Sequence, residues 1–202
     1  PEGIECDVTN YKALFKNLNN FKPDVVIHLA EQRSAPYSMK SIEHKQYTIK
    51  NNSISTLNIL ECAKDLGFRT IHIGTMGVYG YNYDGIITEG DIVRGPGSVY
   101  HLSKCIDNSM FEMYSRLYKC NVVELHQGII WGIGGRFDYD ETFGTVLNRF
   151  ILQRMIGMPF TLYGNGNQLR PFIHIENSLD CVELVINNPR SGFETYNQYT
   201  EI

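Results

Sequence analysis

The sequence of 202 residues lacks several features that would place it in a special class of protein. No apolar run is long enough to cross a bilayer, which argues against a membrane protein. We recognise no signal peptide and no amphipathic, arginine-rich transit sequence. No block of lysine and arginine is present and the net charge is -4, so neither nucleic acids nor membrane surfaces are expected partners.

Disulfide and metal-binding patterns are missing as well. The five cysteines are scattered without CxxC spacing, at Cys6, Cys62, Cys105, Cys120 and Cys181. We expect free thiols in a reducing compartment, the cytoplasm, and no metal site. Internal repeats and low-complexity tracts are also absent. With 43% hydrophobic and 20% charged residues, the composition is that of an ordinary globular protein.

What is present is an alternation of short apolar segments with longer helical patterns. The apolar segments are residues 25–30, 70–76 and 121–132. The first is apolar almost throughout, as expected for a strand that is covered on both faces. Helices are predicted at 11–19, at 41–66 and from Tyr100 onward. This order predicts an α/β fold with a doubly wound parallel sheet and right-handed crossovers.

The last third of the chain has a different pattern and predicts a smaller, mixed α/β lobe. Helices are expected at 141–156 and 176–187, with short strands at 160–164, 170–175 and 195–198. The predicted domains are therefore a sheet domain over residues 1–140 and part of a second lobe over 141–202. We expect this lobe to lie over the edge of the sheet.

Tyr100 and Lys104 are one helical turn apart at the start of the third predicted helix. An ammonium group favours phenolate over phenol, so Lys104 is expected to lower the pKa of Tyr100 from its usual value of about 10. Tyr100 would then be a usable general base near neutral pH. An amphipathic helix with an unrelated tyrosine and lysine is the simpler explanation, and the pair alone favours it.

Polar residues at two further places indicate a site at one edge of the sheet. Residues 31–36 follow directly from the first strand, at the edge where open α/β sheets bind ligands. Asn51 and Asn52 lie in the middle of the predicted helix at 41–66, although asparagine is a mediocre helix former. Either the two side chains are exposed, or an amide of the pair bonds to a group at the sheet edge.

Three motifs, in this order, resemble extended short-chain dehydrogenase/reductases that act on nucleotide sugars. They are Gly74-Thr75-Met76-Gly77-Val78-Tyr79-Gly80, then Tyr100 with Lys104, then Arg170-Pro171-Phe172-Ile173-His174-Ile175. Each motif is weak alone, but the three in order form a specific signal together with Asp7 and the asparagine pair. Longer stretches resemble the UDP-sulfoquinovose synthase family, at residues 31–39, 74–77, 100–104, 143–145, 147–150 and 197–201. The resemblance covers most of the chain.

The resemblance implies a Rossmann-like fold and an enzyme that holds NAD tightly. It would make UDP-sulfoquinovose, the head-group donor for sulfolipid, from UDP-glucose and sulfite. We expect a homodimer, and a chloroplast stromal location if the source is a plant or alga. The implied catalytic residues are Thr75, Tyr100 and Lys104. The implied cofactor-binding residues are Asp7, Leu29, Ala30, Glu31, Asn52, Tyr100, Lys104 and Gln127. The implied substrate-binding residues are Arg33, Thr75, Met76, Gln127, Arg149 and Arg170.

The implied roles follow the chemistry of such enzymes. Tyr100 takes the proton of the sugar 4-hydroxyl, which Thr75 holds, while hydride passes to NAD. The resulting ketone acidifies the hydrogen at C5, water leaves from C6, sulfite adds there, and hydride returns to C4. The arginines would bind sulfite or diphosphate, because their planar guanidinium groups pair with oxyanions.

The chain departs from the family in three ways. Val78 stands where the family has a glutamate, and the loops before Tyr100 and between Trp131 and Phe137 look short. No glycine-rich phosphate loop is visible, so we expect the first βαβ unit to lie upstream of Pro1. Two alternatives stay open. One is a nucleotide-sugar 4-epimerase or 4,6-dehydratase on the same scaffold. The other is a degenerate domain that binds without turnover, which the intact set of Thr75, Tyr100 and Lys104 argues against.

Overall fold

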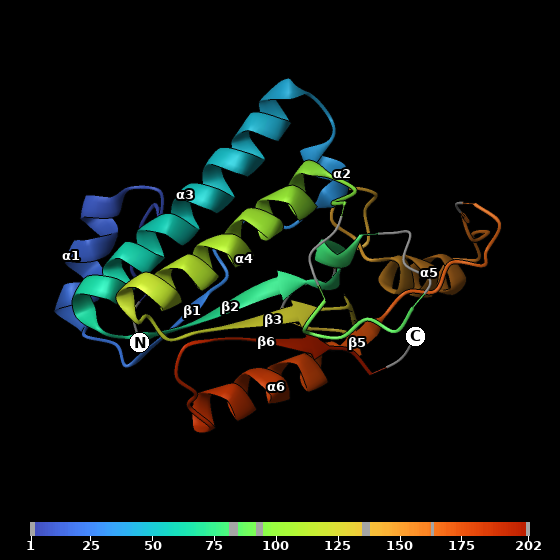
Figure 1. Ribbon diagram of the computed structural model, residues 1–202. Helices are drawn as coiled ribbons and strands as arrows, with labels where there is room; N and C mark the ends of the chain where they lie inside the picture. The colour runs from blue at the N-terminus through green and yellow to red at the C-terminus, as the bar shows by residue number, and fades with distance from the viewer. Residues whose placement is uncertain (1–2, 81–84, 92–94, 135–137, 163, 201–202) are drawn as a thin grey trace.

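The computed structural model describes residues 3–80, 85–91, 95–134, 138–162 and 164–200. A parallel sheet forms the middle of three layers (Figure 1). Its strand order is β1-β2-β3-β6. The strands are β1 (Val25–His28), β2 (Arg69–Thr75), β3 (Val122–Gln127) and β6 (Phe193–Gln198). Each neighbouring pair is parallel, which confirms the predicted parallel pairing of the segments that contain Val26, Ile73 and Val123.

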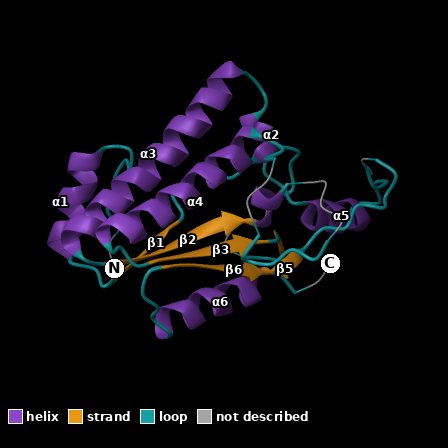
Figure 2. Ribbon diagram, viewed as in Figure 1, coloured by secondary structure: helices purple, strands orange, loops and turns teal. Residues whose placement is uncertain are grey.

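Helices cover both faces of this sheet (Figures 1 and 2). On one face lie α3 (Ile42–Leu66) and α4 (Val99–Tyr118), with α1 (Tyr11–Phe21) beside α3. On the opposite face lies α6 (Ile175–Asn187). The arrangement is therefore doubly wound, as the alternation of strands and helices predicted.

Local sequence accounts for where the three long helices begin and end. The side chains of Asn10, Ser41 and Ser98 each accept a hydrogen bond from a backbone amide in the first turn of α1, α3 and α4. Such N-caps typically contribute about 1 kcal/mol each. Helix α3 ends at Gly67, whose φ of 80° is the left-handed conformation that glycine adopts at little cost.

The apolar core is divided among the layers. One cluster joins α1 to α3 and consists of Leu14, Ile59, Cys62, Ala63 and Phe68. A second joins α3, α4 and β3 and consists of Leu60, Phe111, Tyr114, Cys120 and Val122. A third lies on the α6 side of the sheet and consists of Ile71, Val123 and Leu125. Full burial of one such aliphatic or aromatic side chain contributes about 1.5–3 kcal/mol.

The strand predicted at 121–132 is divided in two. Strand β3 ends at Gln127, and β4 (Ile129–Trp131) pairs instead with β5 (Phe172–His174) in a second, parallel sheet of two strands. The break lies at Gly128, where a Cβ atom would come within 2.8 Å of the Pro171 carbonyl oxygen. The chain can leave the main sheet here because glycine lets the two backbones approach closely.

The predicted boundary at residue 140 also differs from the structure. Strand β6 pairs with β3 and α6 covers the main sheet, so both belong to the three-layer unit although they follow that boundary. What lies beyond the carboxyl ends of the strands is α5 (Val146–Met155). The strand predicted at 160–164 is not formed over 160–162, and residue 163 is outside the described residues.

Two short helices complete the description, α2 (Ala35–Ser38) and the 3-10 helix η1 (Met76–Tyr79). All five cysteines are free thiols, as predicted. In the part of the chain that the structure describes, no helix has the length and apolar character needed to span a membrane. The loops predicted at 81–98 and after Trp131 fall partly outside the described residues.

Candidate active site

The structure brings Thr75, Tyr100 and Lys104 together at the carboxyl end of β2. Thr75 ends this strand, its hydroxyl accepts from the Gly77 amide over 3.1 Å to cap η1, and it lies close enough to the Tyr100 phenol to lower the pKa of that group. Tyr100 and Lys104 lie in the first turns of α4, with the Lys104 ammonium 6.0 Å from the centre of the Tyr100 ring. The Tyr100 amide donates to Ser38 Oγ of α2 over 3.1 Å, which anchors the start of α4. The predicted catalytic set thus shares one site.

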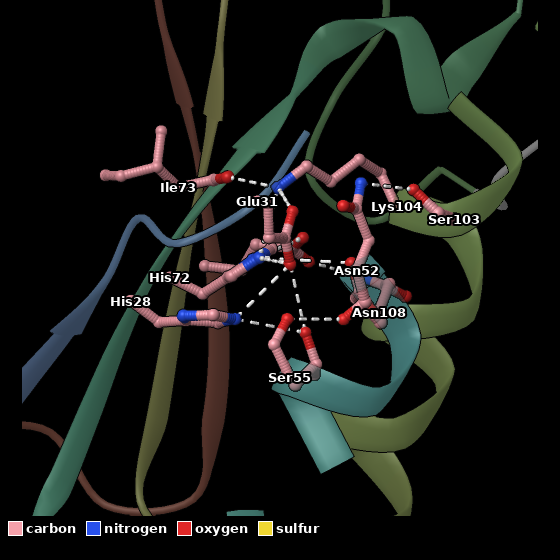
Figure 3. Close-up of polar contacts among 12 residues, drawn as sticks. His28, Glu31, Asn52, Ser55, His72, Ile73, Ser103, Lys104 and Asn108 are labelled. Atoms are coloured by element: carbon pink, nitrogen blue, oxygen red, sulfur yellow. Dashed lines mark hydrogen bonds and ion pairs between the residues drawn. The ribbon is translucent and has the colours of Figure 1, made fainter. Parts of the chain in front are cut away.

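Lys104 has protein partners that its spacing from Tyr100 did not reveal. Its side chain is 5% exposed and forms an ion pair with Glu31, whose side chain is 4% exposed. Its ammonium also donates to the Ile73 carbonyl oxygen over 2.8 Å and lies 3.2 Å from His72 Nε2. Figure 3 shows Lys104 reaching from α4 toward Glu31 and Ile73. Glu31, predicted to line the cofactor site, is therefore also the counter-ion of Lys104.

The ion pair changes the acid–base properties of Tyr100. Burial raises the pKa of Tyr100, the Lys104 charge lowers it and the Glu31 carboxylate raises it again, so the net direction is upward. The prediction of a lowered Tyr100 pKa is wrong for this arrangement, because burial raises the pKa more than the ammonium lowers it, and Glu31 adds to the rise. Burial lowers the pKa of Lys104, but Glu31 together with Tyr100 and Asp107 outweighs burial and raises it above its ordinary value.

His72 connects Glu31 to a second buried carboxylate. Its Nε2 lies 3.2 Å from Glu31 Oε1, and its Nδ1 lies 3.2 Å from Glu124 Oε1. Burial and the charge of Lys104 lower the pKa of His72, but the two carboxylates outweigh them and raise it to about 9. Glu124 is in turn held by Asn108 Nδ2 at 2.7 Å and His126 Nε2 at 3.0 Å.

His28 adds a third imidazole beside this network (Figure 3). Ring or carboxylate atoms of His28, Glu31 and His72 all lie within 4.8 Å of one another. The sequence spacing gave no hint of this group, because its members come from β1, the loop after β1, and β2. We regard it as an ion-pair network and not as a metal centre, because the Lys104 ammonium already pairs with Glu31.

Sequence reasoning missed His28, His72, Asp107 and Glu124. The signal that could have found two of them is the period of two in the strands. His72 alternates with Ile71 and Ile73, and Glu124 alternates with Val123 and Leu125, so their side chains share the opposite face of the sheet. Asp107 lies one turn after Lys104 on α4. Burial and the Glu31 charge raise the pKa of Asp107 to about 8.

Asn52 settles the choice left open for the asparagine pair. It is fully buried, and its amide accepts from the Gln32 amide over 2.8 Å and donates to the Gln32 carbonyl oxygen over 2.9 Å. It also donates to Ser103 Oγ of α4 over 3.0 Å. Asn52 therefore ties the loop after β1 to α3 and α4. The structure gives it a positioning role, and the implied hydrogen bond near the nicotinamide side stays a prediction.

A cavity of about 510 Å³ opens beside the end of β1. Its walls include several of the predicted cofactor-binding residues, namely Asp7, Leu29, Ala30 and Glu31. Arg33 and Phe143 line the same cavity. The strand end and the segment after it thus form one concave surface that adjoins the Glu31–Lys104 pair, as the prediction of a ligand site at this edge requires.

The predicted anion-binding arginines lie in different places. Arg33 forms an ion pair with Asp138, and its guanidinium lies 5.3 Å from the centre of the Phe143 ring. Arg149 lies on α5, and Arg170 precedes β5, so these two arise from the region beyond the strand ends. Met76 follows Thr75 in η1. The predicted binding of an oxyanion by the three arginines stays a prediction.

Gln127 has a protein partner that the resemblance did not imply. It ends β3 opposite Thr75 in the register of the sheet, but its amide donates to Ser178 Oγ of α6. Ser178 belongs to the helix that covers the far side of the sheet from α4. The Gln127 amide therefore supports the packing of α6, and its implied contact with cofactor and substrate stays a prediction.

Comparison with known proteins agrees with this geometry. Residues 2–197 match the NAD dependent epimerase/dehydratase family. A UDP-sulfoquinovose synthase of Sulfolobus acidocaldarius is 37% identical over 97% of this chain and 57% of its own length. A chloroplastic UDP-sulfoquinovose synthase of Spinacia oleracea is 37% identical over 96% of this chain and 46% of its own length. The chain spans about half the length of these curated relatives.

Solved structures show the same fold. A UDP-glucose 4-epimerase of Thermotoga maritima, solved with UDP-glucose, is 23% identical with a TM-score of 0.84, over 98% of this chain and 62% of that one. A UDP-glucuronic acid 4-epimerase of Bacillus cereus, solved with UDP-glucuronic acid and NAD, is 26% identical with a TM-score of 0.83, over 98% and 60%. Both likenesses extend over nearly all of this chain.

Proposed function

The chain belongs to the NAD dependent epimerase/dehydratase family, and we propose that the protein containing it converts UDP-glucose and sulfite to UDP-sulfoquinovose. The observation that carries this proposal is the grouping of Thr75, Tyr100 and Lys104 at the carboxyl ends of parallel strands. Open α/β sheets bind their ligands at this edge. The choice among nucleotide-sugar reactions is supported by the 37% identity to two UDP-sulfoquinovose synthases.

The residues present fit a nicotinamide cofactor. The cavity beside β1 combines the apolar strand-end residues Leu29 and Ala30 with the carboxylates of Asp7 and Glu31, which suits a flat base and ribose hydroxyls. Lys104 lies next to Glu31 and would reach the ribose nearer the reacting ring. When bound, NAD supplies a reversible hydride acceptor.

The protein residues then divide the proton chemistry. Thr75 holds the 4-hydroxyl of the sugar, since its hydroxyl lies beside Tyr100, closely enough to lower the pKa of the phenol. Tyr100, as phenolate, takes the proton from that hydroxyl. Lys104 favours the phenolate because its charge is close to the ring. The segment from Arg33 to Met39, which resembles the synthase family, supplies an arginine at the cavity for an oxyanion such as sulfite.

A 4-epimerase or 4,6-dehydratase is the second candidate. Proteins of both kinds are among the relatives, and both reactions begin with oxidation at C4 by the same set of side chains. The reactions diverge after this first oxidation. Only the synthase reaction requires sulfite and ends with a carbon–sulfur bond at C6.

The experiment that separates the candidates uses the full-length protein with UDP-glucose and NAD, with and without sulfite, followed by mass spectrometry of the sugar nucleotide. A product that contains sulfonate and forms only when sulfite is supplied supports the synthase. A product of unchanged mass with an inverted 4-hydroxyl, or a product that has lost water without sulfite, replaces it with the second candidate. Binding without turnover would favour a degenerate domain.

We also infer that the full-length protein forms a homodimer through α3 and α4. These helices lie side by side on one face of the molecule (Figure 1). They expose the apolar side chains of Tyr47, Leu57, Leu102, Met113, Leu117 and Tyr118. Burial of such a surface against a second copy would remove it from water. Light scattering that gives the mass of one subunit would contradict this. The predicted cytoplasmic or stromal location stays a prediction.

A further inference from the structure

The Lys104 ammonium interacts with two groups, the Tyr100 phenol and the Glu31 carboxylate. Tyr100 needs the ammonium to favour its phenolate, whereas Glu31 pairs with the same ammonium and favours the phenol. If Glu31 had no other cationic partner, its charge would cancel that of Lys104 beside Tyr100. His72 is placed to prevent this, because its Nε2 lies 3.2 Å from the other oxygen of the same carboxylate.

We propose that His72, held as an imidazolium by Glu124, is a positioning residue that takes part of the charge of Glu31 and thereby leaves Lys104 available to Tyr100. The inference rests on the proposed function in that it takes Tyr100 as the general base. His72 does not touch the substrate in this scheme. It acts through Glu31 and Lys104 on the base.

The two carboxylates that face His72 favour its charged form over a neutral ring that would accept from the Lys104 ammonium, 3.2 Å from Nε2. Each of its two ring nitrogens faces a carboxylate oxygen at 3.2 Å, Glu31 Oε1 on one side and Glu124 Oε1 on the other. A neutral imidazole donates from one nitrogen only, so one of the two contacts would set a lone pair against a carboxylate. The imidazolium donates to both. The ring is also fully buried, so water cannot replace either partner.

Glu124 is built to hold this ring. Its second oxygen accepts from Asn108 Nδ2 over 2.7 Å and lies 3.0 Å from His126 Nε2. Gly74 of β2 lies opposite His126 in the register of the sheet, and a Cβ atom on it would come within 2.7 Å of Glu124 Oε1. The glycine in the Gly74-Thr75 motif therefore makes room for the carboxylate that fixes His72. Substitution of Gly74 by alanine would displace Glu124.

Glu31 is fixed by the same surroundings. Its Oε1 accepts from the Thr56 hydroxyl over 3.0 Å and lies 3.4 Å from His28 Nε2. The Lys104 ammonium lies 3.2 Å from His72 Nε2, donates to the Ile73 carbonyl oxygen over 2.8 Å and lies 6.0 Å from the centre of the Tyr100 ring. The charged or titratable groups around His72 are His28 from β1, Glu31 from the following loop, Glu124 and His126 from β3, and Lys104 and Asp107 from α4.

The first test needs no turnover. In the full-length protein labelled with ¹⁵N-histidine, the signal that disappears in His72→Gln identifies His72. We expect both of its nitrogens to stay protonated at pH 7.5, and Glu124→Gln to bring its titration down toward the usual value of about 6.5. A neutral His72 at pH 7.5 in the unsubstituted protein, or a titration that Glu124→Gln leaves unmoved, would overturn the proposal.

The second test follows Tyr100 by ¹³Cζ-tyrosine NMR, with Tyr100→Phe to assign the signal. His72→Gln should raise the pH at which Tyr100 ionises by about one unit, and Glu31→Gln should lower it, since one removes a cation and the other an anion. His72→Lys keeps a cation and should restore the original value. His44→Gln, on α3 with Ser41 as its partner, is the matched control and should leave Tyr100 unchanged.

The pH profile of hydride transfer completes the test. If the pKa of Tyr100 rises by one unit in His72→Gln, the rate should fall about tenfold at pH values below that raised pKa. The rate should recover at higher pH. A merely structural role predicts a loss that is uniform across pH and no shift of Tyr100, which would overturn the inference. If no sugar nucleotide supports hydride transfer in the unsubstituted protein, the proposed function fails, while both NMR tests still decide the role of His72.

Discussion

The two faces of the main sheet are both buried but differ in chemistry. The face toward α6 carries Ile71, Val123 and Leu125, which pack against Val182 and Val185 of that helix. The face toward α3 and α4 carries charged or titratable side chains at the alternate positions of the same strands, namely His28, His72, Glu124 and His126. One set of strands thus serves two kinds of interior.

The described α6 face is held by apolar contacts, whereas the face toward α3 and α4 combines an apolar cluster that includes Val122 with the charged side chains. Apolar burial on the α6 side contributes about 25 cal/mol per Å² removed from water. The attraction within a buried ion pair does little more than offset the free energy lost when its charges leave water. Stability alone therefore does not explain why charged side chains lie on the opposite face. Its charges converge on Lys104, which points to control of the Tyr100 site as their purpose. Substitutions on the two faces should therefore affect different measurements.

The largest expected effect is on activity at the polar face. Tyr100→Phe removes the proton acceptor and keeps the ring in the helix, so turnover should fall about a hundred- to ten-thousand-fold while the melting temperature stays nearly the same. Turnover of UDP-glucose with sulfite, measured beside thermal melting in the full-length protein, checks this. Normal turnover by a well-folded Tyr100→Phe protein would remove Tyr100 from the mechanism.

A matched pair of neighbours on β3 tests the two faces directly. Glu124→Leu leaves two histidines without their carboxylate and should cost about 3–5 kcal/mol of unfolding free energy. Leu125→Ala, facing α6, should cost about 2–5 kcal/mol by leaving a cavity. The double change His72→Leu with Glu124→Leu separates the effect on stability from the effect on activity. Removing both ions together should restore most of the unfolding free energy and still impair activity.

Denaturant unfolding of these variants gives the free energies, and activity per folded molecule gives the functional effect. Leu125→Ala should keep the activity of its folded fraction. A stable and fully active His72→Leu, Glu124→Leu double variant would show that the polar face is dispensable for the site.

The pH dependence of stability sharpens the contrast further. The pKa of His72 is raised to about 9 from 6.5, so its stabilisation is fully present below about pH 6.5 and is lost as the pH rises through 9. The pKa of Asp107 is raised to about 8, which adds a loss in the same direction up to that pH. Stability measured between pH 6.5 and 9 should therefore fall, and His72→Gln should flatten the curve. An equally steep curve in that variant would exclude His72 as its source.

The smallest expected effect lies away from both faces. Asn10→Ala removes the N-cap of α1, whose side chain accepts from the Ala13 amide over 3.2 Å. It should cost about 1 kcal/mol of unfolding free energy, with activity unchanged, because α1 packs on the outer side of α3. A change in the pH profile of this variant would indicate that the polar network is more extended than its contacts suggest.

Several features could be predicted from sequence because they depend on neighbouring residues. The short apolar runs predicted the strands, Gly67 predicted the end of α3, and the four-residue spacing placed Tyr100 and Lys104 on one helix face. The boundary at residue 140 could not be predicted in the same way. Strand β6 pairs with β3 although 65 residues, starting with Gly128, lie between the end of β3 and Phe193, the first residue of β6. Such a pairing leaves no local signal in the sequence.

The order of residues alone specified the alternation of strands and helices, and the presence of a threonine, a tyrosine and a lysine at the ends of such elements. The role of Lys104 is set only in the folded chain. Its ammonium pairs with Glu31 from the loop after β1 and lies beside His72 from β2. These two residues precede Lys104 in the sequence by 73 and 32 positions. The sign of a pKa shift depends on the sum of charges within a few ångströms and on burial, and neither can be read from spacing along a helix.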